Sequence, residues 1–252
     1  MFKNQVIKLN KEIGETPLEC IKRFKQANPE FAEDKMTYAG RLDPLAEGLL
    51  LVLVGEECKQ KEKYLKLDKE YELTILFGIE TDSLDVLGLI EKTKPGALDY
   101  FSQFKQDDFQ NLLKKFEKTF VQKYPKFSSK TIAGRPLFQI SKEEGISADD
   151  LPTREVSIEQ IDFLNFNFVS KKYLADFVQK NISKVKGNFR QELSLNSWEK
   201  NLKMLPDENL PILTLKVRCS SGTYMRSLAQ NIGILVGYPA LALLIKRTMI
   251  YL

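Results

Sequence analysis

The chain has 252 residues, of which 43% are hydrophobic and 29% are charged, a composition typical of a globular protein with one large domain. Its longest uninterrupted apolar run spans residues 49–54, far short of the ~20 residues that a membrane-spanning helix needs. The first residues lack the apolar segment of a secretion signal. The sequence therefore predicts no membrane segment, and we expect the protein in the cytoplasm.

The absence of histidine limits the chemistry that this chain can perform. Without histidine there is no Ser/His or Cys/His nucleophile pair and no His-ligated metal. The three cysteines, Cys20, Cys58 and Cys219, lie far apart and predict neither a disulfide framework nor a zinc site. If the protein is an enzyme, we expect acids, tyrosine, lysine and arginine to do its chemistry, without a metal.

The net charge of +4 is concentrated in one segment. Residues 171–203 contain eight Lys or Arg against three acidic residues, a net charge of +5, so the rest of the chain sums to −1. Such a segment is typical of a surface that follows nucleic-acid phosphates or of a solvated helix face. On charge alone, the solvated face is the better interpretation.

The N-terminal residues predict a strand followed by a helix. Residues 6–9 form a short strand, and Thr16-Pro17-Leu18-Glu19 combines an N-cap Thr, a Pro at the first helical position and the Glu of a capping box. The buried face of this helix is predicted to contain Leu18, Ile21 and Phe24. Residues 49–54 are a buried strand or the end of a buried helix, which periodicity does not distinguish. Residues 56–67 are compatible with a helix.

The next segments predict a strand, a turn and a helix. In residues 71–77, Tyr71 and apolar side chains alternate as in a sheet with one covered face. The loop GIETDSLDVLG, residues 78–88, is rich in acids, but the Gly and Glu of a calcium loop are out of place, so it is interpreted as a polar turn. Apolar residues recur at helical spacing over residues 108–121.

The C-terminal half predicts further strands and helices. Residues 124–138 are rich in Pro, Gly and Ser and predict an irregular segment or a twisted hairpin. Residues 158–168 and 213–219 predict strands, and a helix is expected from about Thr223. The segment 169–205 is longer than an ordinary connection, so we expect an inserted helical element. Because strands and helices do not alternate regularly, the fold is predicted to be α+β, with a mixed or antiparallel sheet flanked by helices.

Asp43 lies in the stretch YAGRLDPLAEG, residues 38–48, directly before Pro44. Asp followed by Pro is typical of a helix N-cap with Pro at the first helical position, and composition alone favours that role. Arg226 lies in the first turn of a predicted helix, where the macrodipole disfavours a cation. An anion is therefore expected near Arg226, and both a phosphate and the Asp43 carboxylate are candidates.

The same stretch resembles the signature of the TruB-type tRNA pseudouridine synthases, Gly-x-Leu-Asp-Pro-Leu-Ala-x-Gly followed by an apolar run. Seven residues match it: Gly40, Leu42, Asp43, Pro44, Leu45, Ala46 and Gly48. Further segments resemble the family in the same order along the chain: LNKEIGETP, KEYELTILFG, GIETDSLDVLG, YPKFSSKTIAGRPLF and CSSGTYMRSLAQNIG.

This resemblance implies the residues of an active site. Asp43 matches the family's catalytic Asp, Tyr71 its active-site tyrosine, and Arg226 its active-site arginine, which would pair with Asp43. Tyr38 stands where most members have His and is expected to stack on an RNA base. The other substrate-binding residues implied are Lys11, Gly40, Leu42, Tyr224 and Ile245.

The activity that the resemblance implies is the isomerisation of uridine to pseudouridine at position 55 in the T-loop of tRNA. Asp43 would be the nucleophile on a flipped-out nucleotide, although the residues do not distinguish attack on the sugar from removal of a sugar proton. No cofactor is expected, because no atom leaves the substrate. The partner would be the T-arm of tRNA, with no obligate protein partner, and the protein is expected to be a monomer.

The chain also departs from the family pattern. Thr131 stands at the family's Lys, with Lys130 one position earlier. The basic segment 169–205 is extra, and we expect residues 1–252 to form a single catalytic domain without a separate C-terminal RNA-binding domain. One hypothesis is that the insertion supplies phosphate contacts which that domain would otherwise make. Two alternatives stay open: an RNA-binding or RNA-folding protein on the same scaffold, and a synthase for another RNA uridine.

Overall fold

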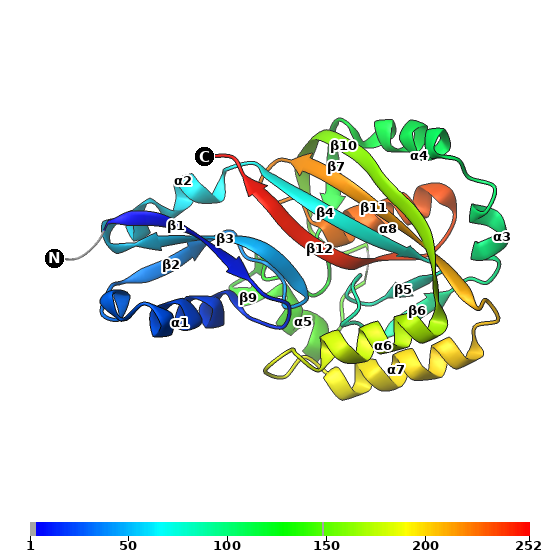
Figure 1. Cartoon of the computed structure of the whole chain (residues 1–252), viewed down its shortest axis with the longest axis horizontal. Coiled ribbons are helices and arrows are strands. Elements are labelled where there is room, and N and C mark those ends of the chain that lie inside the picture. The colour runs from blue at the N-terminus through cyan, green and yellow to red at the C-terminus, as the bar shows by residue number, and fades with distance from the viewer. Residues whose placement is uncertain (1–3, 148) are drawn as a thin grey trace.

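The structure, a computed structural model, describes residues 4–147 and 149–252 (Figure 1). Its strands are β1 (Gln5–Lys11), β2 (Met36–Ala39), β3 (Ala46–Val54), β4 (Lys69–Phe77), β5 (Ile79–Thr81), β6 (Ile90–Thr93), β7 (Thr119–Lys123), β8 (Thr131–Ile132), β9 (Arg135–Pro136), β10 (Thr153–Ser170), β11 (Asn209–Cys219) and β12 (Ala240–Ile250). Its α-helices are α1 (Pro17–Ala27), α2 (Lys61–Leu65), α3 (Ala97–Phe101), α4 (Gln106–Leu113), α5 (Leu137–Glu143), α6 (Lys171–Ile182), α7 (Gln191–Met204) and α8 (Met225–Val236). The 3-10 helices are η1 (Pro29–Phe31), η2 (Gly55–Gln60) and η3 (Lys114–Phe116).

One large sheet forms the framework of the molecule. Its strand order is β1-β3-β12-β4-β11-β10-β7, with β2 also paired to β3 (Figure 1). Neighbouring strands are antiparallel except β3 and β12, which run parallel where residues 46–48 meet residues 245–247. The mixed sheet with flanking helices confirms the predicted α+β fold. Because β3 begins inside this sheet and not at its edge, the residues just before it are held against the centre of the molecule.

The two faces of the sheet carry separate apolar cores. On one face, alternate residues of β4 from Tyr71 to Phe77 pack with Leu228 and Ile232 of α8. On the other face, Leu76 of β4 packs in a cluster with Trp198 of α7. Successive side chains of a strand point to opposite faces, so β4 joins both cores and places Tyr71 on the α8 side.

The N-terminal strand and helix form as predicted. The Glu19 N–H donates to Thr16 Oγ1 at 3.2 Å and the Thr16 N–H donates to Glu19 Oε2 at 2.8 Å, which completes the capping box of α1. Residues 49–54 belong to β3, so this apolar run is a strand. The prediction that Leu18 is buried is wrong, because its side chain is 58% exposed. The buried residues of α1 are instead Pro17, Cys20 and Ile21. Cys20 and Ile21 lie one turn after Pro17, on the same side of the helix.

The predicted helix over residues 108–121 is wrong in its second half. α4 ends at Leu113, and β7 begins at Thr119 and pairs with β10. Phe116 and Phe120 still pack against the same core as Phe109. The helical spacing of these aromatics therefore spans two different elements, and strand pairing with β10 decided the conformation of the second one.

Between β10 and β11 lies a helical hairpin formed by α6 and α7, which confirms the helices expected within residues 169–205. It packs beside β5 and β6 (Figure 1), and the indole N–H of Trp198 donates to the Val86 carbonyl at 2.9 Å. α7 has only 14 residues, and no helix within the described part of the chain is long and apolar enough to cross a membrane.

Candidate active site

Asp43 lies in a β-turn that leads into a strand. The Ala46 N–H donates to the Asp43 carbonyl at 3.0 Å, and β3 begins at Ala46. Asp43 and Pro44 therefore occupy the first two positions of the turn, where Asp and Pro are both favoured. The interpretation of Asp43 as a helix N-cap is wrong, because the same residue pair suits a turn and the chain continues as a strand paired with β1 and β12.

Arg226, at the start of α8, is the partner of the Asp43 carboxylate. Its Nε lies 2.8 Å from Asp43 Oδ2. The Arg226 side chain is 3% exposed, whereas that of Asp43 is 30% exposed. Arg226 Nε has no hydrogen-bond partner among the described residues, so the contact is an ion pair whose N–H is not aimed at the carboxylate. The pair thus has a buried cationic end and an acidic end that a ligand can reach.

Two carbonyls and a second acid hold the Arg226 guanidinium. Nη1 donates to the Ser83 carbonyl at 2.8 Å and Nη2 donates to the Phe127 carbonyl at 3.2 Å. The Asp85 carboxylate lies 3.8 Å from Nε. Burial by itself would lower the pKa of Arg226, but the charges of Asp43 and Asp85 outweigh burial and raise that pKa. The guanidinium therefore stays charged although it is buried.

Lys11, at the end of β1, fastens the turn that carries Asp43. Its Nζ donates to the carbonyls of Glu12, Pro44 and Ala46 at 3.0, 3.2 and 2.6 Å. The residue is fully buried, and burial lowers its pKa to about 8 against the opposing charge of Asp43. Lys11, predicted to bind substrate, therefore lies beneath the turn and contacts protein carbonyls.

Two of the predicted tyrosines lie near Asp43. Tyr71 is buried on β4, and Tyr224 directly precedes α8, where its N–H donates to Gln122 Oε1 at 2.8 Å. Burial raises the pKa of both phenol groups, and the negative charge of Asp43 adds to the rise. The structure thus places Tyr71 and Tyr224 where the charge of Asp43 acts on both, with Arg226 paired to the same carboxylate.

The remaining predicted residues lie around this group. Leu42 is buried next to Asp43, and Ile245 is buried on β12 opposite Leu73 of β4. The Gly40 carbonyl accepts a hydrogen bond from Arg247 Nη2 at 3.1 Å. Tyr38 lies on β2, and its hydroxyl accepts a weak hydrogen bond from Arg41 Nη2 at 3.4 Å.

A cavity of about 280 Å³ opens over the Asp43–Arg226 pair. Its walls come from the start of α1, the turn at 41–44, the loop at 83–87, the segment 127–142 and the α6–α7 loop at 188–190. Of the predicted site residues, the described lining includes Leu42, Asp43 and Arg226 but not Lys11, Tyr38, Gly40, Tyr71, Tyr224 or Ile245.

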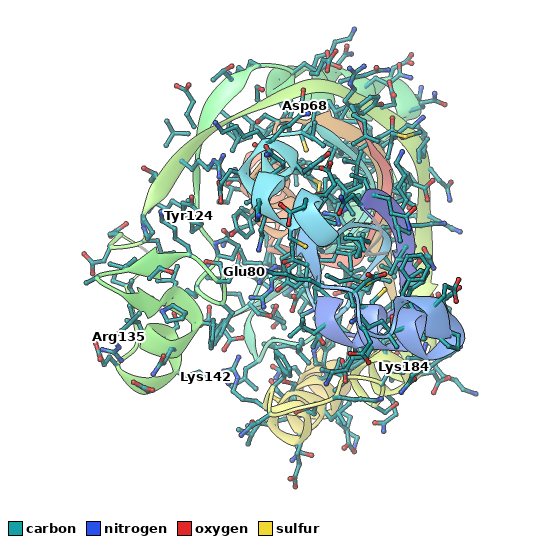
Figure 2. The ribbon with its side chains drawn as sticks, turned by 90° about the vertical axis from the view of Figure 1, so that its left-hand side faces the viewer. Asp68, Glu80, Tyr124, Arg135, Lys142 and Lys184 are labelled. Carbon is teal, nitrogen blue, oxygen red and sulfur yellow. The ribbon has the colours of Figure 1, made fainter. Side chains whose placement is uncertain are left out.

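The surroundings of the cavity are mostly apolar or basic. Phe127 and Phe138 lie in its wall with the ion pair, a combination typical of sites that hold a flat ligand by packing and a few polar contacts. Figure 2 shows Lys142 of α5 and Lys184, which follows α6, in the lower half of this view. Within the described residues, no group of three or more His, Cys, Asp or Glu could hold a metal ion.

Sequence reasoning missed the roles of Asp82 and Asp85. The loop at 78–88 was interpreted as a polar turn, but Asp85 faces Arg226, and Asp82 pairs with Arg190 at 2.8 Å. Burial raises the pKa of Asp85, and Arg226 opposes that rise. The sequence indicates such pairs only indirectly, because residues 78–88 contain several acids and no Lys or Arg. Their partners could not be found locally, because Arg190 lies 108 positions after Asp82.

A known protein family matches the part of the chain that contains Asp43. Residues 28–187, more than half of the chain, match the family model described as TruB family pseudouridylate synthase, N-terminal domain. This chain belongs to the TruB family of pseudouridylate synthases. The match includes Asp43, Tyr71 and Asp85, and it confirms the resemblance and the isomerase class predicted from the sequence motifs.

Relatives within the TruB family align over nearly the whole chain. The tRNA pseudouridine synthase B of Bordetella pertussis (strain Tohama I) is 28% identical over 243 residues, which cover 96% of this chain and 79% of the relative. The protein of the same name from Borreliella afzelii (strain PKo) is 28% identical over 250 residues, which cover 99% of this chain and 70% of the relative.

Solved structures share the fold. One is a chain from an H/ACA RNP bound to a substrate RNA containing 2'-deoxyuridine, with a TM-score of 0.53 and 18% identity. Another is a chain from a Cbf5-Nop10-Gar1 complex, with a TM-score of 0.54 and 18% identity. Each match covers 97% of this TruB-family chain but 47% and 48% of the other chain. The chain therefore spans about half the length of these structures, and the likeness establishes a common fold.

Proposed function

We propose that this protein is a tRNA pseudouridine synthase that converts uridine 55 of the T-loop to pseudouridine, acting as a monomer in the cytoplasm. The observation that carries the proposal is the 2.8 Å ion pair between Arg226 and the partly exposed Asp43 at the wall of a cavity. The name tRNA pseudouridine synthase B, which both relatives above carry, supports tRNA as the substrate. Residues 1–252 act as one catalytic unit, since β1 and β12, from opposite ends of the chain, flank β3 in one sheet.

Asp43 acts as the nucleophile in this proposal. Its carboxylate attacks C1′ of the ribose as the bond from C1′ to N1 breaks, and the uracil then turns in the cavity. A bond from C5 to C1′ replaces the carboxylate ester, the C5 proton leaves, and N1 ends with a proton. No atom is lost and no electrons are exchanged with another molecule, so the reaction needs no cofactor. Arg226 fixes the orientation of the carboxylate.

The target base must leave its stack to reach Asp43. Enzymes that act on a base in a folded nucleic acid flip the nucleotide into a pocket and hold the base by stacking. Tyr71 stacks on the uracil in this proposal, and burial raises the pKa of its hydroxyl, which favours this role over that of a base. Leu42, Tyr224 and Ile245 contact the nucleotide. Lys11 acts on the turn, through the carbonyls of Pro44 and Ala46.

Two regions outside the pocket complete the proposal. Tyr38 and Gly40 contact the RNA next to the flipped nucleotide, where an exposed aromatic ring can stack on a neighbouring base. The α6–α7 hairpin supplies phosphate contacts to the T-arm, as its basic charge suggests.

The assay is pseudouridine mapping on an unmodified tRNA transcript. The transcript is incubated with the wild-type protein or with Asp43→Ala, and pseudouridine is located by chemical derivatisation and reverse-transcription stops. We expect product at uridine 55 with the wild type and a loss of at least about 1,000-fold in kcat with the variant, as for the removal of a nucleophile. Product at another uridine would contradict the assigned position, and binding without product would indicate an RNA-binding protein.

A matched control separates loss of the nucleophile from loss of charge. Glu47 lies four residues after Asp43, on β3, and is not in the described lining of the cavity. Glu47→Gln removes one negative charge from the same segment and should leave kcat within about twofold of wild type. Asp43→Ala should still bind the tRNA transcript, because Arg226 retains Asp85 as an ion-pair partner.

A further inference from the structure

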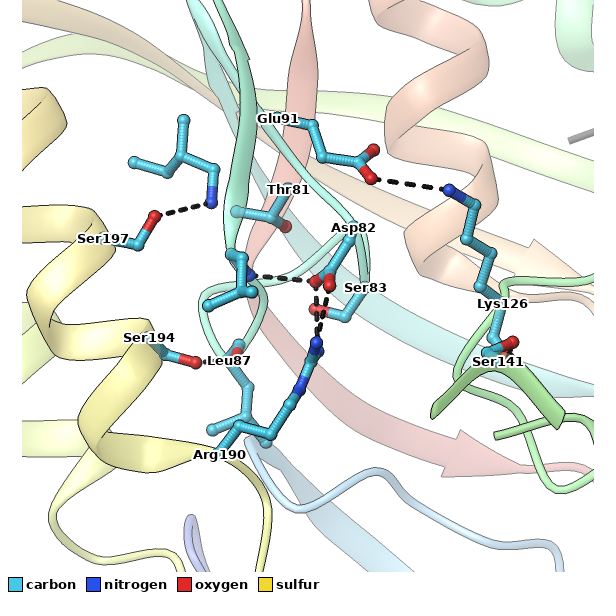
Figure 3. Close-up of polar contacts among 12 residues, drawn as sticks. Thr81, Asp82, Ser83, Leu87, Glu91, Lys126, Ser141, Arg190, Ser194 and Ser197 are labelled. Carbon is cyan, nitrogen blue, oxygen red and sulfur yellow. Dashed lines mark hydrogen bonds and ion pairs between the residues drawn. The ribbon is translucent and has the colours of Figure 1, made fainter. Parts of the chain in front are cut away.

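The α6–α7 hairpin reaches the active site through Arg190, the residue before α7. Arg190 lines the cavity, and its Nη1 and Nη2 donate to Asp82 Oδ2 and Oδ1 at 2.8 and 3.2 Å (Figure 3). Its guanidinium also lies over the Phe127 ring, 4.3 Å from the ring centroid. A two-point ion pair and a cation–π contact from one side chain join two segments that are separate in the chain.

The same two segments hold Arg226. Asp82 precedes Ser83, whose carbonyl accepts the Arg226 Nη1 hydrogen bond, and the Phe127 carbonyl accepts the Nη2 hydrogen bond. Arg190 therefore contacts the side chains of Asp82 and Phe127. The carbonyls of Ser83 and Phe127, in the same two segments, hold the Arg226 guanidinium that pairs with Asp43. A shift of either segment would change the position of Arg226.

The hairpin is fixed to this loop at further points. The Ser194 hydroxyl donates to the Leu87 carbonyl at 2.6 Å, and the Ile90 N–H donates to Ser197 Oγ at 3.0 Å (Figure 3). α7 is thereby held along the loop at 82–90, and Arg190 sits at the end of α7 that is nearest the cavity. Arg190 thus directly precedes a helix that is fixed to this loop.

The backbone at position 190 is unfavourable for an arginine. Arg190 has φ +62° and ψ +31°, in the left-handed region that Gly and Asn adopt most easily. It is the N-cap of α7 but makes no side-chain capping hydrogen bond, and its charge faces the positive end of the helix dipole. Asn would suit the left-handed backbone better and would carry no positive charge at this end of the helix. The contacts to Asp82 and Phe127 offset these costs, so the side chain explains the residue at this position.

We propose that Arg190 is a positioning residue for the catalytic ion pair. By clamping Asp82 to Phe127, it holds the Ser83 and Phe127 carbonyls, and through them Arg226 and Asp43, in the reactive arrangement. The inference rests on the proposed function, because it concerns the same site. Through Arg190, the α6–α7 hairpin thus acts on the catalytic ion pair. This role is separate from contacts between the hairpin and RNA phosphates.

Arg190→Asn is the variant that tests this role. Asn suits the left-handed backbone and carries no positive charge at the start of α7, so α7 should stay folded. With a tRNA transcript as substrate, we expect kcat to fall roughly 10- to 100-fold, as for a misplaced reacting group, and KM to change less than about threefold. Arg190→Lys keeps the charge but loses the two-point geometry and the stacking, so it should recover only part of kcat.

Arg218 offers a matched control elsewhere in the protein. Its Nε lies 2.8 Å from Glu159 Oε2, and its guanidinium lies 4.1 Å from the centroid of the Tyr251 ring. Arg218→Gln therefore removes an acid pair and an aromatic stack of the same kind, outside the described cavity lining. We expect kcat for this variant to stay within about twofold of wild type.

A second measurement does not depend on turnover. The Arg226 Nε–H is buried and should give a slowly exchanging ¹⁵N NMR signal, assigned by its loss in Arg226→Lys. We expect faster exchange of this proton in Arg190→Asn and no change in Arg218→Gln. An unchanged Arg226 signal in Arg190→Asn overturns the proposal whatever kcat does.

The two proposals fail in different ways. A wild-type protein that forms no pseudouridine in the tRNA transcript overturns the proposed function, while the exchange of the Arg226 proton still decides whether Arg190 positions it. If Arg190→Asn instead raises KM and weakens the salt dependence of binding with kcat unchanged, Arg190 contacts RNA and the positioning role is overturned.

Discussion

Buried cations hold the turn that carries Asp43. Lys11, Arg226 and Arg247 are at most 2% exposed, and each donates to main-chain carbonyls; Arg247, for example, donates to the Leu49 carbonyl at 2.6 Å. A buried charge is costly unless its donors find partners. Carbonyls accept most of the hydrogen bonds from these cations, so the Asp43 carboxylate does not have to be buried to satisfy them. It remains partly exposed, where a ligand can reach it.

Lys11 should make the stability of the fold depend on pH. Its pKa is lowered from 10.5 to about 8 by burial in the folded protein. Between these values the unfolded chain binds more protons than the folded one, so the free energy of unfolding rises with pH as the buried amine becomes neutral. We expect Lys11 to contribute a rise of up to about 3 kcal/mol between pH 8 and pH 10.5.

Urea unfolding followed by the fluorescence of Trp198 measures this effect. The experiment compares wild type with Lys11→Met across this pH range. Lys69, whose pKa burial also lowers to about 8, is present in both proteins, so its contribution cancels. A difference in stability between the two proteins that stays constant with pH would contradict the prediction.

Among the elements, the α6–α7 hairpin contacts both sides of the candidate site. α7 holds the loop at 82–90, and the residues after α6 meet the loop before α1. Gly14 in that loop donates its N–H to the Pro44 carbonyl at 2.8 Å. A Cβ at position 14 would lie 2.5 Å from the Lys184 carbonyl oxygen. The packing of α6 is thereby connected to the turn of Asp43.

Gly14→Ala should destabilise the protein and impair catalysis. Gly14 has φ +92°, and the added methyl group would push Lys184 away from the loop, so we expect a loss of roughly 2–4 kcal/mol in the free energy of unfolding. The displaced Pro44 should also lower kcat. Chemical denaturation and the pseudouridine assay measure the two effects.

Gly237→Ala is the control for backbone strain alone. Gly237 follows α8 with φ +74°, and among the described residues its Cβ would meet nothing within 4 Å. Its replacement should cost only about 1 kcal/mol. If Gly14→Ala and Gly237→Ala lose the same free energy of unfolding, the contact with Lys184 does not contribute to the loss in Gly14→Ala.

For the whole molecule, three exposed lysines of the hairpin lie at the end nearest the cavity, while Lys172 and Lys200 are exposed toward its other end. Lys180, Lys184 and Lys186 are exposed near the loop that lines the cavity, and Figure 2 shows Lys184 at this edge. By contrast, Lys171 and Lys203 are paired with Glu208 and Glu199. Lys180, Lys184 and Lys186 therefore face solvent close to the cavity.

Replacing Lys180, Lys184 and Lys186 by Gln should weaken tRNA binding and its dependence on salt. Each lost phosphate contact lowers the slope of log K against log salt concentration by about 0.7–0.9, so we expect a decrease of about 2. Binding is measured over a range of salt concentrations. Deletion of the hairpin would not test this prediction, because it also removes Arg190 and the contacts of Trp198.

The matched control carries the same change in net charge on another face. Lys114, Lys115 and Lys118 are exposed beyond α4, away from the hairpin (Figure 1). Their replacement by Gln should leave the salt slope nearly unchanged. An equal decrease in both triple variants would point to net charge and not to phosphate contacts of the insertion.

Local patterns in the sequence determined several parts of this protein by themselves. The capping box of α1 depends on contacts within a few residues, so its spacing predicts it, and the alternation of apolar residues predicts β4 as a strand. The ordered motifs likewise predicted the family and the residues Asp43, Tyr71 and Arg226.

Only the tertiary structure decided which charges meet. Composition alone favoured a helix cap for Asp43, yet β3 pairs with β1 and β12 and the residues before it form a turn. Phe120 had helical spacing, yet pairing of β7 with β10 made it part of a strand. Arg190 looked like one of many surface cations, yet it meets Asp82, 108 positions away. Buried charges need partners, and packing alone determines which distant segments supply them.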